Sequence, residues 1–578
     1  MSDKKEKIPD QKEIEKEIGD FLSKKFGGSV KVVAPPSLNL QNQMDGTGDK
    51  VKKSGEKLNF DMNPEELVSY LDQYIIKQDD AKKILSTKIC THFNRIKYSE
   101  NSKENHEILG NIKSNILMIG PTGVGKTYMI KLIAKKLGVP FAKGDATKFT
   151  ETGYVGGDVE DLVRDLVREA NDDIELAQKG IIYIDEIDKI ASSSNLMGAD
   201  ISRTGVQRTL LKPMEETDVE LKVPHDPISM LQEMERFQKG GGTERRVVNT
   251  GNILFIMSGA FGNITNIVKK RLSKQTIGFG SELKKEENLE LLKEIRTEDL
   301  IKYGFESEFV GRLPIRAIFE KLSEQDLFDI LKSPNNPVLL NKKLDFAAYG
   351  VDIKFHDEAL KVLAKRAFHE NTGARGIVSA VEQALLSFEN KLPSTNVTQF
   401  AVTKDVVDNP DAELENIVEK HETSVFRKAF KEVADEEKDS IREYISNNWK
   451  SLSIKYNFTL TQYRINFVVD YYCKYATNIG HAIKKISSYF KEVKEIETVF
   501  IKNHGININF DDDAIDFIIE QFIESEASSD EVYNKLTSDF EHGLRLAVEK
   551  TGRNSFNIPK SALIEPDTYL GEIIKESY

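Results

Sequence analysis

Two short segments hold residues whose types and spacing suit chemistry on phosphate groups. The first segment is Gly120-Pro121-Thr122-Gly123-Val124-Gly125-Lys126-Thr127, a complete GxxxxGK[ST] phosphate loop. Its glycines allow backbone N–H groups to face the phosphates, Lys126 can reach the outer phosphates, and the Thr127 hydroxyl can hold Mg²⁺. The loop therefore predicts a site for ATP with Mg²⁺.

The second segment is an acidic pair, Asp185-Glu186, which follows the apolar run Ile181 to Ile184. Asp185 is placed to bind the magnesium ion directly or through water, and Glu186 to orient and deprotonate the attacking water. An acidic helix start after a strand is the alternative interpretation, and it explains Asp188 well enough. It does not explain why a second buried strand should deliver acids beside the first.

Three apolar runs predict buried strands that position these two segments. They are Ile116 to Ile119, Ile181 to Ile184 and the run from Asn252 to Phe261, and a helix is predicted from Tyr128 to Leu137. This order predicts an α/β fold of the P-loop NTPase type, a parallel sheet flanked by helices. Ser258, at the polar end of the third strand, is expected to sense the γ-phosphate.

Upstream of the phosphate loop, Ile75 and Ile76 follow Tyr74 in a hinge between two predicted helices. An apolar hinge in this position can form a wall for an adenine ring. A helix–helix turn that simply packs in the core explains the same residues without the downstream motif.

Two further segments that contain glycine are predicted to be loops with exposed apolar side chains. Gly153-Tyr154-Val155-Gly156 predicts a mobile loop tip that contacts a partner, and an aromatic side chain folded back onto the surface is the alternative. Ile277-Gly278-Phe279 lies on a polar loop, where an exposed Ile and Phe suggest docking into the pocket of a partner.

Two arginines are candidates for contact with phosphates. Arg312 follows a glycine and precedes Leu-Pro, a setting that suits an arginine acting in trans on the nucleotide of a neighbouring subunit. A surface salt bridge is the alternative for a lone arginine. Arg375 opens a predicted helix and can reach back to the phosphates.

Composition excludes several classes of protein. The 578 residues predict several domains, and 81 basic against 94 acidic residues give a net charge of -13, which argues against non-specific binding to nucleic acid or to anionic membranes. No run approaches the roughly 20 apolar residues of a membrane span, and the amino terminus lacks an apolar leader, so we expect a cytoplasmic protein. The 2 cysteines form no C-x-x-C pair, which excludes a thiolate zinc site.

The number and order of these motifs over residues 60–410 resemble the AAA+ ATP-dependent protein unfoldases of the ClpX and HslU group, with ClpX the nearer of the two. The resemblance implies ATP-driven unfolding and translocation of protein substrates through a homohexameric ring. It also implies that the Tyr154 loop is the pore loop, that Arg312 is the trans arginine and that Arg375 is the second sensor. The loop from Ile277 to Phe279 is similar to the one that docks on a ClpP-type peptidase.

Departures from the family pattern concern substrate choice. No cysteine precedes Cys90, so we do not expect the four-cysteine zinc domain of ClpX in this sequence, and Lys77 stands where the family has glycine. Three alternatives stay open: a remodelling chaperone without a peptidase, a nucleotide-switched interaction protein, and a nucleic-acid motor.

Residues 505–515 resemble residues 350–360, which suggests a degenerate second copy of the small helical domain without an equivalent of Arg375. Chance similarity between two strand–turn–helix starts explains the pattern equally. The predicted units are a flexible segment (1–57), a large nucleotide-binding domain (58–320) with a surface insertion (222–249), a small helical domain (321–410), an α-rich extension (411–500) and this second small-domain-like unit (501–578).

Overall fold

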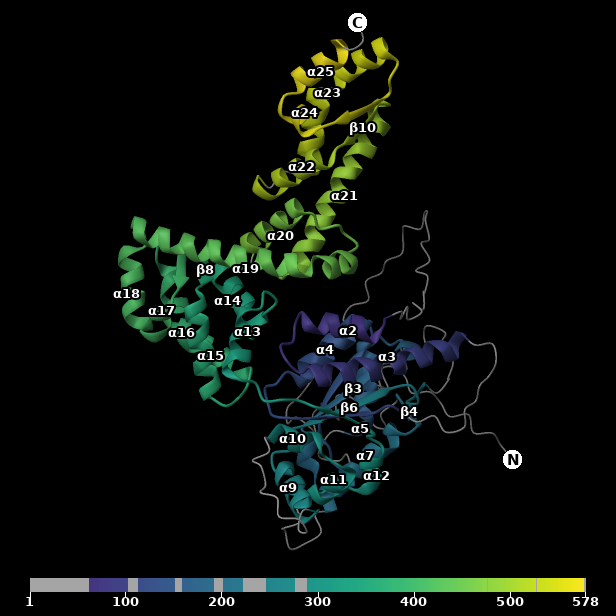
Figure 1. Cartoon of the computed structure of the whole chain (residues 1–578). Coiled ribbons are helices and arrows are strands. Elements are labelled where there is room, and N and C mark those ends of the chain that lie inside the picture. Colours follow the sequence, from purple (N-terminus) through teal and green to yellow (C-terminus); the bar gives the residue numbers. More distant parts are fainter. Residues whose placement is uncertain are drawn as a thin grey trace, which may run out of the picture.

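The computed structural model of the chain describes residues 62–101, 113–150, 158–191, 201–221, 246–275, 288–475, 477–525 and 528–575. Three groups of elements follow one another along the chain (Figure 1): a sheet covered by helices, a small helical unit, and a carboxyl-terminal group of helices with two short strands. None of the helices in these described ranges is long and apolar enough to span a membrane.

A five-stranded parallel sheet forms the centre of the first group, with the strand order β2-β3-β6-β1-β7. Buried apolar residues dominate β1, β3 and β6, as expected for parallel strands that are covered on both faces. These three are the strands that the apolar runs predict, so the predicted α/β fold is confirmed. The strands are β1 (Ile116–Ile119), β2 (Phe141–Asp145), β3 (Ile181–Asp185), β6 (Leu254–Gly259) and β7 (Ile315–Ile318).

Alternate strand residues face two separate hydrophobic cores, one on each side of the sheet. Met118 and Tyr183 belong to one core, and Leu117 and Ile184 belong to the other. The first face is covered by α2 (Pro64–Asp72), α3 (Asp79–Asn101) and α4 (Lys126–Leu137). The second is covered by α5 (Val159–Glu169), α6 (Ile174–Ala177), α7 (Ile201–Met214), α9 (Ile264–Gln275), α10 (Asn288–Lys293), α11 (Thr297–Tyr303) and α12 (Ser307–Gly311).

Parallel pairing brings the loops after β1 and β3 to the same edge of the sheet, with β6 between the two strands. The phosphate loop follows β1, and the acidic pair ends β3. Two short 3₁₀ turns, η1 (Ala146–Lys148) and η2 (Ile187–Ile190), also lie at this edge.

A separate antiparallel pair joins β4 (Asp218–Glu220) to β5 (Val247–Asn249). This pair brackets the predicted insertion, most of which, residues 222–245, lies outside the described residues.

The small helical unit shares the first hydrophobic core of the sheet, through buried aromatic residues such as Phe346, Phe388 and Phe400. Its two strands pair in parallel, with Asp352 opposite Gln399. The elements are α13 (Glu324–Lys332), α14 (Pro337–Ala347), β8 (Asp352–Phe355), α15 (Asp357–His369), α16 (Arg375–Lys391), η3 (Leu392–Ser394), β9 (Gln399–Val402), α17 (Lys404–Asp408) and α18 (Pro410–Lys420).

The carboxyl-terminal group has its own hydrophobic core and begins with three long helices. The first of them, α19, runs from α18 across to α20 (Figure 1). The helices are α19 (Ser424–Tyr456), α20 (Gln462–Tyr475) and α21 (Ile479–His504). The boundary expected after residue 500 therefore falls inside α21.

The last seventy residues repeat the element order of the small helical unit. Apart from the short turn η3 in the first, residues 352–420 and 507–575 both run strand, helix, helix, strand, helix, helix, and the strands pair in parallel in both, with Asn507 opposite Ser555 in the second. A left-handed glycine precedes the first strand in each case, Gly350 (φ 77°) and Gly505 (φ 72°). The elements are β10 (Asn507–Phe510), α22 (Asp512–Glu524), α23 (Ser529–Thr551), β11 (Ser555–Ile558), α24 (Lys560–Ile564) and α25 (Pro566–Lys575).

Candidate active site

The phosphate loop encloses the amine of Lys126 between β1 and α4. The Nζ of Lys126 donates hydrogen bonds of 2.6 Å to the carbonyl oxygens of Gly120 and Pro121. Burial lowers the pKa of Lys126 to about 8, although the Asp185 and Asp188 carboxylates act in the opposite direction. The ammonium group is therefore held inside the loop, at the amino-terminal end of α4.

Thr127 and Asp185 bring two oxygen ligands together at the edge of the sheet. The Thr127 hydroxyl donates to the Asp185 carboxylate over 3.3 Å. Burial raises the pKa of Asp185, but hydrogen bonds from Ser258 and from the Glu186 amide outweigh that effect, so the pKa is lowered. An ionised carboxylate beside a hydroxyl is a set of ligands that fits Mg²⁺.

The structure places the Ser258 side chain against Asp185, whereas its position at the end of the third strand suggested a contact with the γ-phosphate. Its side chain is fully buried, and its hydroxyl donates to Asp185 over 2.5 Å and lies 2.6 Å from the hydroxyl of Tyr183. Tyr183 also lies 3.0 Å from the Thr127 hydroxyl. Ser258 and Tyr183 therefore orient Asp185 and Thr127. Sequence reasoning missed the role of Tyr183, although its hydroxyl is the one polar side-chain group in the run from Ile181 to Ile184.

Glu186 directly follows Asp185 and has an unusual backbone conformation. Its φ of 57° lies in the left-handed region, which costs a residue other than glycine roughly 1–3 kcal/mol and is concentrated at functional sites. The side chain is exposed, and the backbone amide donates to Asp185 over 3.1 Å. This turn presents the Glu186 carboxylate to solvent at the edge that carries the phosphate loop.

The small helical unit touches the phosphate loop through its backbone. The Ala374 amide donates a 2.7 Å hydrogen bond to the Gly123 carbonyl oxygen. A Cβ atom on Gly123 would lie 1.9 Å from the Thr372 carbonyl oxygen, and one on Gly373 would lie 2.7 Å from the Gly123 oxygen. Sequence reasoning missed this contact, although the glycine before the predicted helix was its visible signal.

Arg375 is the first residue of α16 and is exposed at this contact. Its positive charge contributes to the lowered pKa of Lys126, although burial is the largest cause. An exposed guanidinium at the contact with the phosphate loop can bind an anion such as a phosphate group.

Ile75 and Ile76 lie in the turn between α2 and α3; Ile75 is buried and Ile76 is half-buried. The next residues, Lys77 and Gln78, both adopt left-handed conformations, with φ of 62° and 65°. The Gln78 side chain exchanges two hydrogen bonds, of 2.9 and 2.8 Å, with the backbone of Glu320. The turn is thereby fastened to the segment that connects β7 to the small helical unit.

Arg312 lies away from this group. Its carbonyl oxygen accepts a 3.2 Å hydrogen bond from the side chain of Asn115, the residue before β1, and its guanidinium pairs with Glu215. The phosphate loop begins after β1, whose 4 residues span about 13 Å. Arg312 therefore lies at the opposite edge of the sheet from the phosphate loop of its own chain.

Two segments that the sequence predicts to be partner-binding loops lie outside the described residues. These are the predicted contact loop Gly153-Tyr154-Val155-Gly156 and the predicted docking loop Ile277-Gly278-Phe279. Both remain predictions from the sequence.

Two family models match consecutive parts of the chain. Residues 111–316 match the model described as AAA domain (Cdc48 subfamily), and residues 322–388 match the one described as C-terminal, D2-small domain, of ClpB protein. The first match contains the phosphate loop and the Asp185-Glu186 pair. The second match contains Arg375, the first residue of α16. The chain thus has the two-part organisation of an AAA+ ATPase.

Curated relatives carry the name ATP-dependent Clp protease ATP-binding subunit ClpX. Those of Borrelia duttonii (strain Ly) and Borrelia recurrentis (strain A1) are each 41% identical over 358 residues, which cover 61% of this chain and 79% of the relative. The relative from Treponema denticola is 41% identical over 336 residues, covering 57% of this chain and 77% of its own length. At this identity and coverage, the chain belongs to the ClpX family of AAA+ ATPases.

Proposed function

We propose that this chain hydrolyses ATP to unfold proteins and to thread them through a homohexameric ring into a ClpP-type peptidase. The observation that carries the proposal is the meeting of Lys126, Thr127, Asp185 and Glu186 at one edge of the sheet, with the small domain bonded to the same loop. The printed name of the relatives, an ATP-binding subunit of an ATP-dependent protease, supports the peptidase partner.

Each of these side chains has a separate role in ATP hydrolysis. Lys126 binds the outer phosphates, and Thr127 and Asp185 hold Mg²⁺, which when bound neutralises charge on the phosphates. Glu186 orients a water molecule and accepts its proton as the water oxygen attacks the γ-phosphorus. The bond from the γ-phosphorus to the bridging oxygen then breaks, which leaves ADP and inorganic phosphate.

Arg312 acts on the site of the neighbouring subunit. Its place at the far edge of the sheet leaves it too distant from its own phosphate loop, and its side chain is 48% exposed beside Glu215. Stabilisation of the charge on the transferring phosphoryl group by such an arginine is worth about 10³ to 10⁵ in rate. A ring is therefore needed for full activity.

Arg375 and the Ala374 contact link the nucleotide to the position of the small domain. Exchange of ATP for ADP changes the charge near Arg375, and this change alters the position of the small domain. Tyr154, on the pore loop, converts this movement into a pull on the substrate. Ile277, Gly278 and Phe279 hold the ring on the peptidase.

The first test is whether Glu186→Gln separates ATP binding from turnover. The variant is expected to bind ATP with an affinity within about threefold of the wild type and to lose more than about 10²-fold in kcat, because only proton transfer is removed. Glu175→Gln, an exposed acid on α6, is the matched control and should keep full activity. Normal turnover in Glu186→Gln would refute the assigned role.

The second test addresses the peptidase. Replacement of Ile277 and Phe279 by serine is expected to abolish binding to a ClpP-type ring while ATP turnover stays unchanged. If wild-type rings do not bind such a peptidase but still unfold proteins, the chain is a remodelling chaperone that works alone.

A further inference from the structure

The carboxyl-terminal end of α19 reaches the turn that carries Ile75 and Ile76. There the Nζ of Lys455 donates a 2.9 Å hydrogen bond to the side-chain oxygen of Gln73. The same amine lies 4.6 Å from the ring centroid of Tyr70 and 5.4 Å from that of Tyr74. Gln73 and Tyr74 directly precede Ile75 and Ile76 in the chain. The residues that α19 contacts therefore lie close in sequence to the proposed adenine wall.

The contact is a cage of aromatic faces around one cation. Lys455 also lies 5.1 Å from the ring centroid of Tyr456, the next residue of α19. The negative faces of aromatic rings attract an ammonium ion, most strongly where water is partly excluded. Burial also lowers the pKa of Lys455, to about 8. The Lys455 side chain, which belongs to α19, is thus half-buried against α2 and the turn that follows it.

The middle of α19 is fixed on the small domain by ion pairs. Glu437 is 14% exposed and pairs with Lys343 and with Lys354, whose Nζ lies 3.5 Å from it. Burial raises the pKa of Glu437, but the two ammonium groups outweigh burial and lower it. His356 lies 3.7 Å from Glu436 on the same side of α19.

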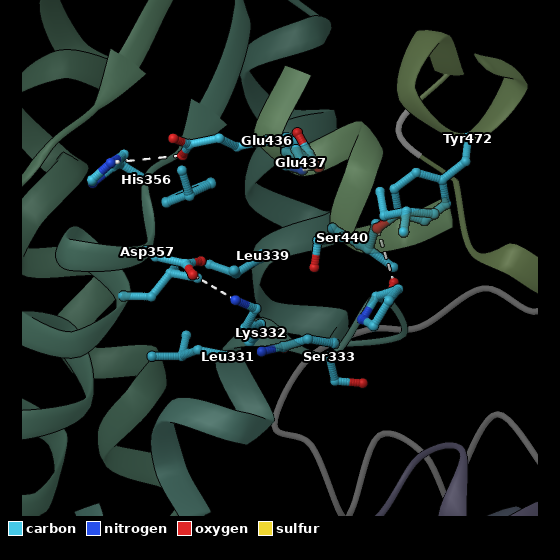
Figure 2. A pocket seen from close by; sticks show the side chains of 17 residues that line it. Leu331, Lys332, Ser333, Leu339, His356, Asp357, Glu436, Glu437, Ser440 and Tyr472 are labelled. Carbon is cyan, nitrogen blue, oxygen red and sulfur yellow. Dashed lines mark hydrogen bonds and ion pairs between the residues drawn. The ribbon is translucent and has the colours of Figure 1, made fainter. Parts of the chain in front are cut away.

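Figure 2 shows the contact between His356 and Glu436 at a cavity of about 310 Å³ between the small domain, α19 and α20. At one side of the cavity, the hydroxyl of Tyr472, on α20, donates a 3.0 Å hydrogen bond to the carbonyl oxygen of Pro334. Next to Pro334, the Asn335 side chain donates 3.2 Å to the carbonyl oxygen of Gln73. The loop after α13 therefore contacts both α20 and the turn between α2 and α3, which we call the nucleotide turn.

We propose that α19 is a brace that fixes the small domain relative to the nucleotide turn, with Lys455 as the positioning residue for Ile75 and Ile76. This inference rests on the proposed function, because it assumes that ATP binds between the turn, the phosphate loop and Arg375. Glu437 and Lys455 are separated by roughly 27 Å of continuous helix, which is stiff on this scale. A rigid helix anchored in both domains limits their relative rotation, and the extension thereby sets the affinity for ATP.

Lys455→Met tests the anchor because it keeps the side-chain length and removes the charge. The KM for ATP is expected to rise about five- to tenfold while kcat stays within about twofold, since the hydrolytic residues are untouched. Lys455→Arg should keep the wild-type KM and kcat, because arginine keeps the charge and stacks on aromatic rings. Lys450→Met is the control: Lys450 is exposed on the same helix and contacts Trp449.

Two outcomes would overturn the brace. One is a KM in Lys455→Met within about twofold of that in Lys450→Met. The other is a fall in kcat together with the melting temperature, without rescue by arginine, which would make Lys455 a structural residue only.

A distance measurement tests the brace with a readout that does not depend on ATPase activity. Spin labels at Ser69 on α2 and Leu386 on α16, both exposed, report the distance between the domains after Cys473 is replaced by serine. The distribution is expected to be narrow in the wild type and in Lys455→Arg, and broader in Lys455→Met. An identical distribution in all three would contradict the proposal. If the wild type neither binds nor hydrolyses ATP, the proposed function fails as well; if it does both and Lys455→Met matches it, only the brace fails.

Discussion

The backbone amide of Ala374, in the small domain, donates a 2.7 Å hydrogen bond to the carbonyl oxygen of Gly123, in the phosphate loop. No side chain intervenes, and both Gly123 (φ 73°) and Gly373 (φ 64°) are left-handed glycines that allow the two backbones to approach. Movement of the small domain must therefore alter the phosphate loop directly. The contact gives the ATPase a short mechanical path from the nucleotide to the small domain.

Gly373→Ala is expected to weaken ATP binding at least about tenfold, because its new Cβ would lie 2.7 Å from the Gly123 oxygen and would push the domains apart. Gly350→Ala is the matched control: it has a similar left-handed φ of 77° but open space around the added Cβ. Both variants should lose roughly 1–2 kcal/mol of unfolding free energy from backbone strain. Titration with a fluorescent ATP analogue separates them; equal affinities would argue against the contact.

The affinity for ATP is expected to fall as the pH rises through about 8. The pKa of Lys126 is lowered to about 8 by burial, and bound phosphates will raise it, because they favour the ammonium form. Below both pKa values the amine is charged in the free and bound states, so the affinity does not depend on it. Above about 8, binding must take up a proton, and the affinity falls by up to about tenfold per pH unit.

Calorimetry in two buffers of different ionisation enthalpy measures this proton uptake. At a pH of about 9, close to one proton per bound ATP is expected, and at about 7 close to none. An affinity that stays constant between these pH values would show that Lys126 keeps its proton without the nucleotide.

Mixing two inactive variants tests whether Arg312 acts in trans. Arg312→Ala alone and Glu186→Gln alone should each lose more than about 10²-fold in turnover. In a mixed ring, an Arg312→Ala subunit next to a Glu186→Gln subunit forms a site that has both an intact Glu186 and an intact Arg312. Mixtures are therefore expected to regain part of the wild-type rate.

A mixture that stays as inactive as its components would place both residues in the same subunit's site. The control mixes Glu186→Gln with Lys126→Ala. Both of these changes lie in the cis half of the site, so that mixture should not recover activity.

Tyr154→Ala is expected to keep ATP turnover within about threefold of the wild type and to lose protein unfolding, because we propose that Tyr154 contacts the substrate and not the nucleotide. Val155→Ala, on the same predicted loop, should have a smaller effect, since a valine offers less surface to a polypeptide than a tyrosine does. The measurement compares ATP turnover with unfolding in the same preparation. Loss of both activities together would give Tyr154 a role in the fold.

The sequence was sufficient for the parts of the site that are local in the chain. The phosphate loop and the Asp185-Glu186 pair are contiguous motifs at strand ends, and the runs before them identify the strands. Parallel pairing then brings Thr127 and Asp185 together without further information. These features could be predicted because each depends on neighbours within a few residues.

Contacts between distant segments could not be predicted in the same way. Gln78 and Glu320, or Lys455 and Gln73, meet only because whole domains pack in one arrangement, and neither pair has a motif. Ser258 illustrates the same limit, since its strand was predicted but its hydrogen bond to Asp185 was not. A side chain's partner depends on the three-dimensional packing, whereas its strand depends on the local pattern.

The most direct test of the central claim is ATP-dependent loss of native fluorescence from a green fluorescent protein with an unstructured tail. The tail is taken from a protein that Glu186→Gln rings retain in ATP, so that recognition is assured before unfolding is measured. Wild-type rings with ATP are expected to extinguish the fluorescence, whereas Glu186→Gln rings should bind the reporter and leave it folded. If wild-type rings hydrolyse ATP and bind the tail but the fluorescence persists, the chain is not an unfoldase.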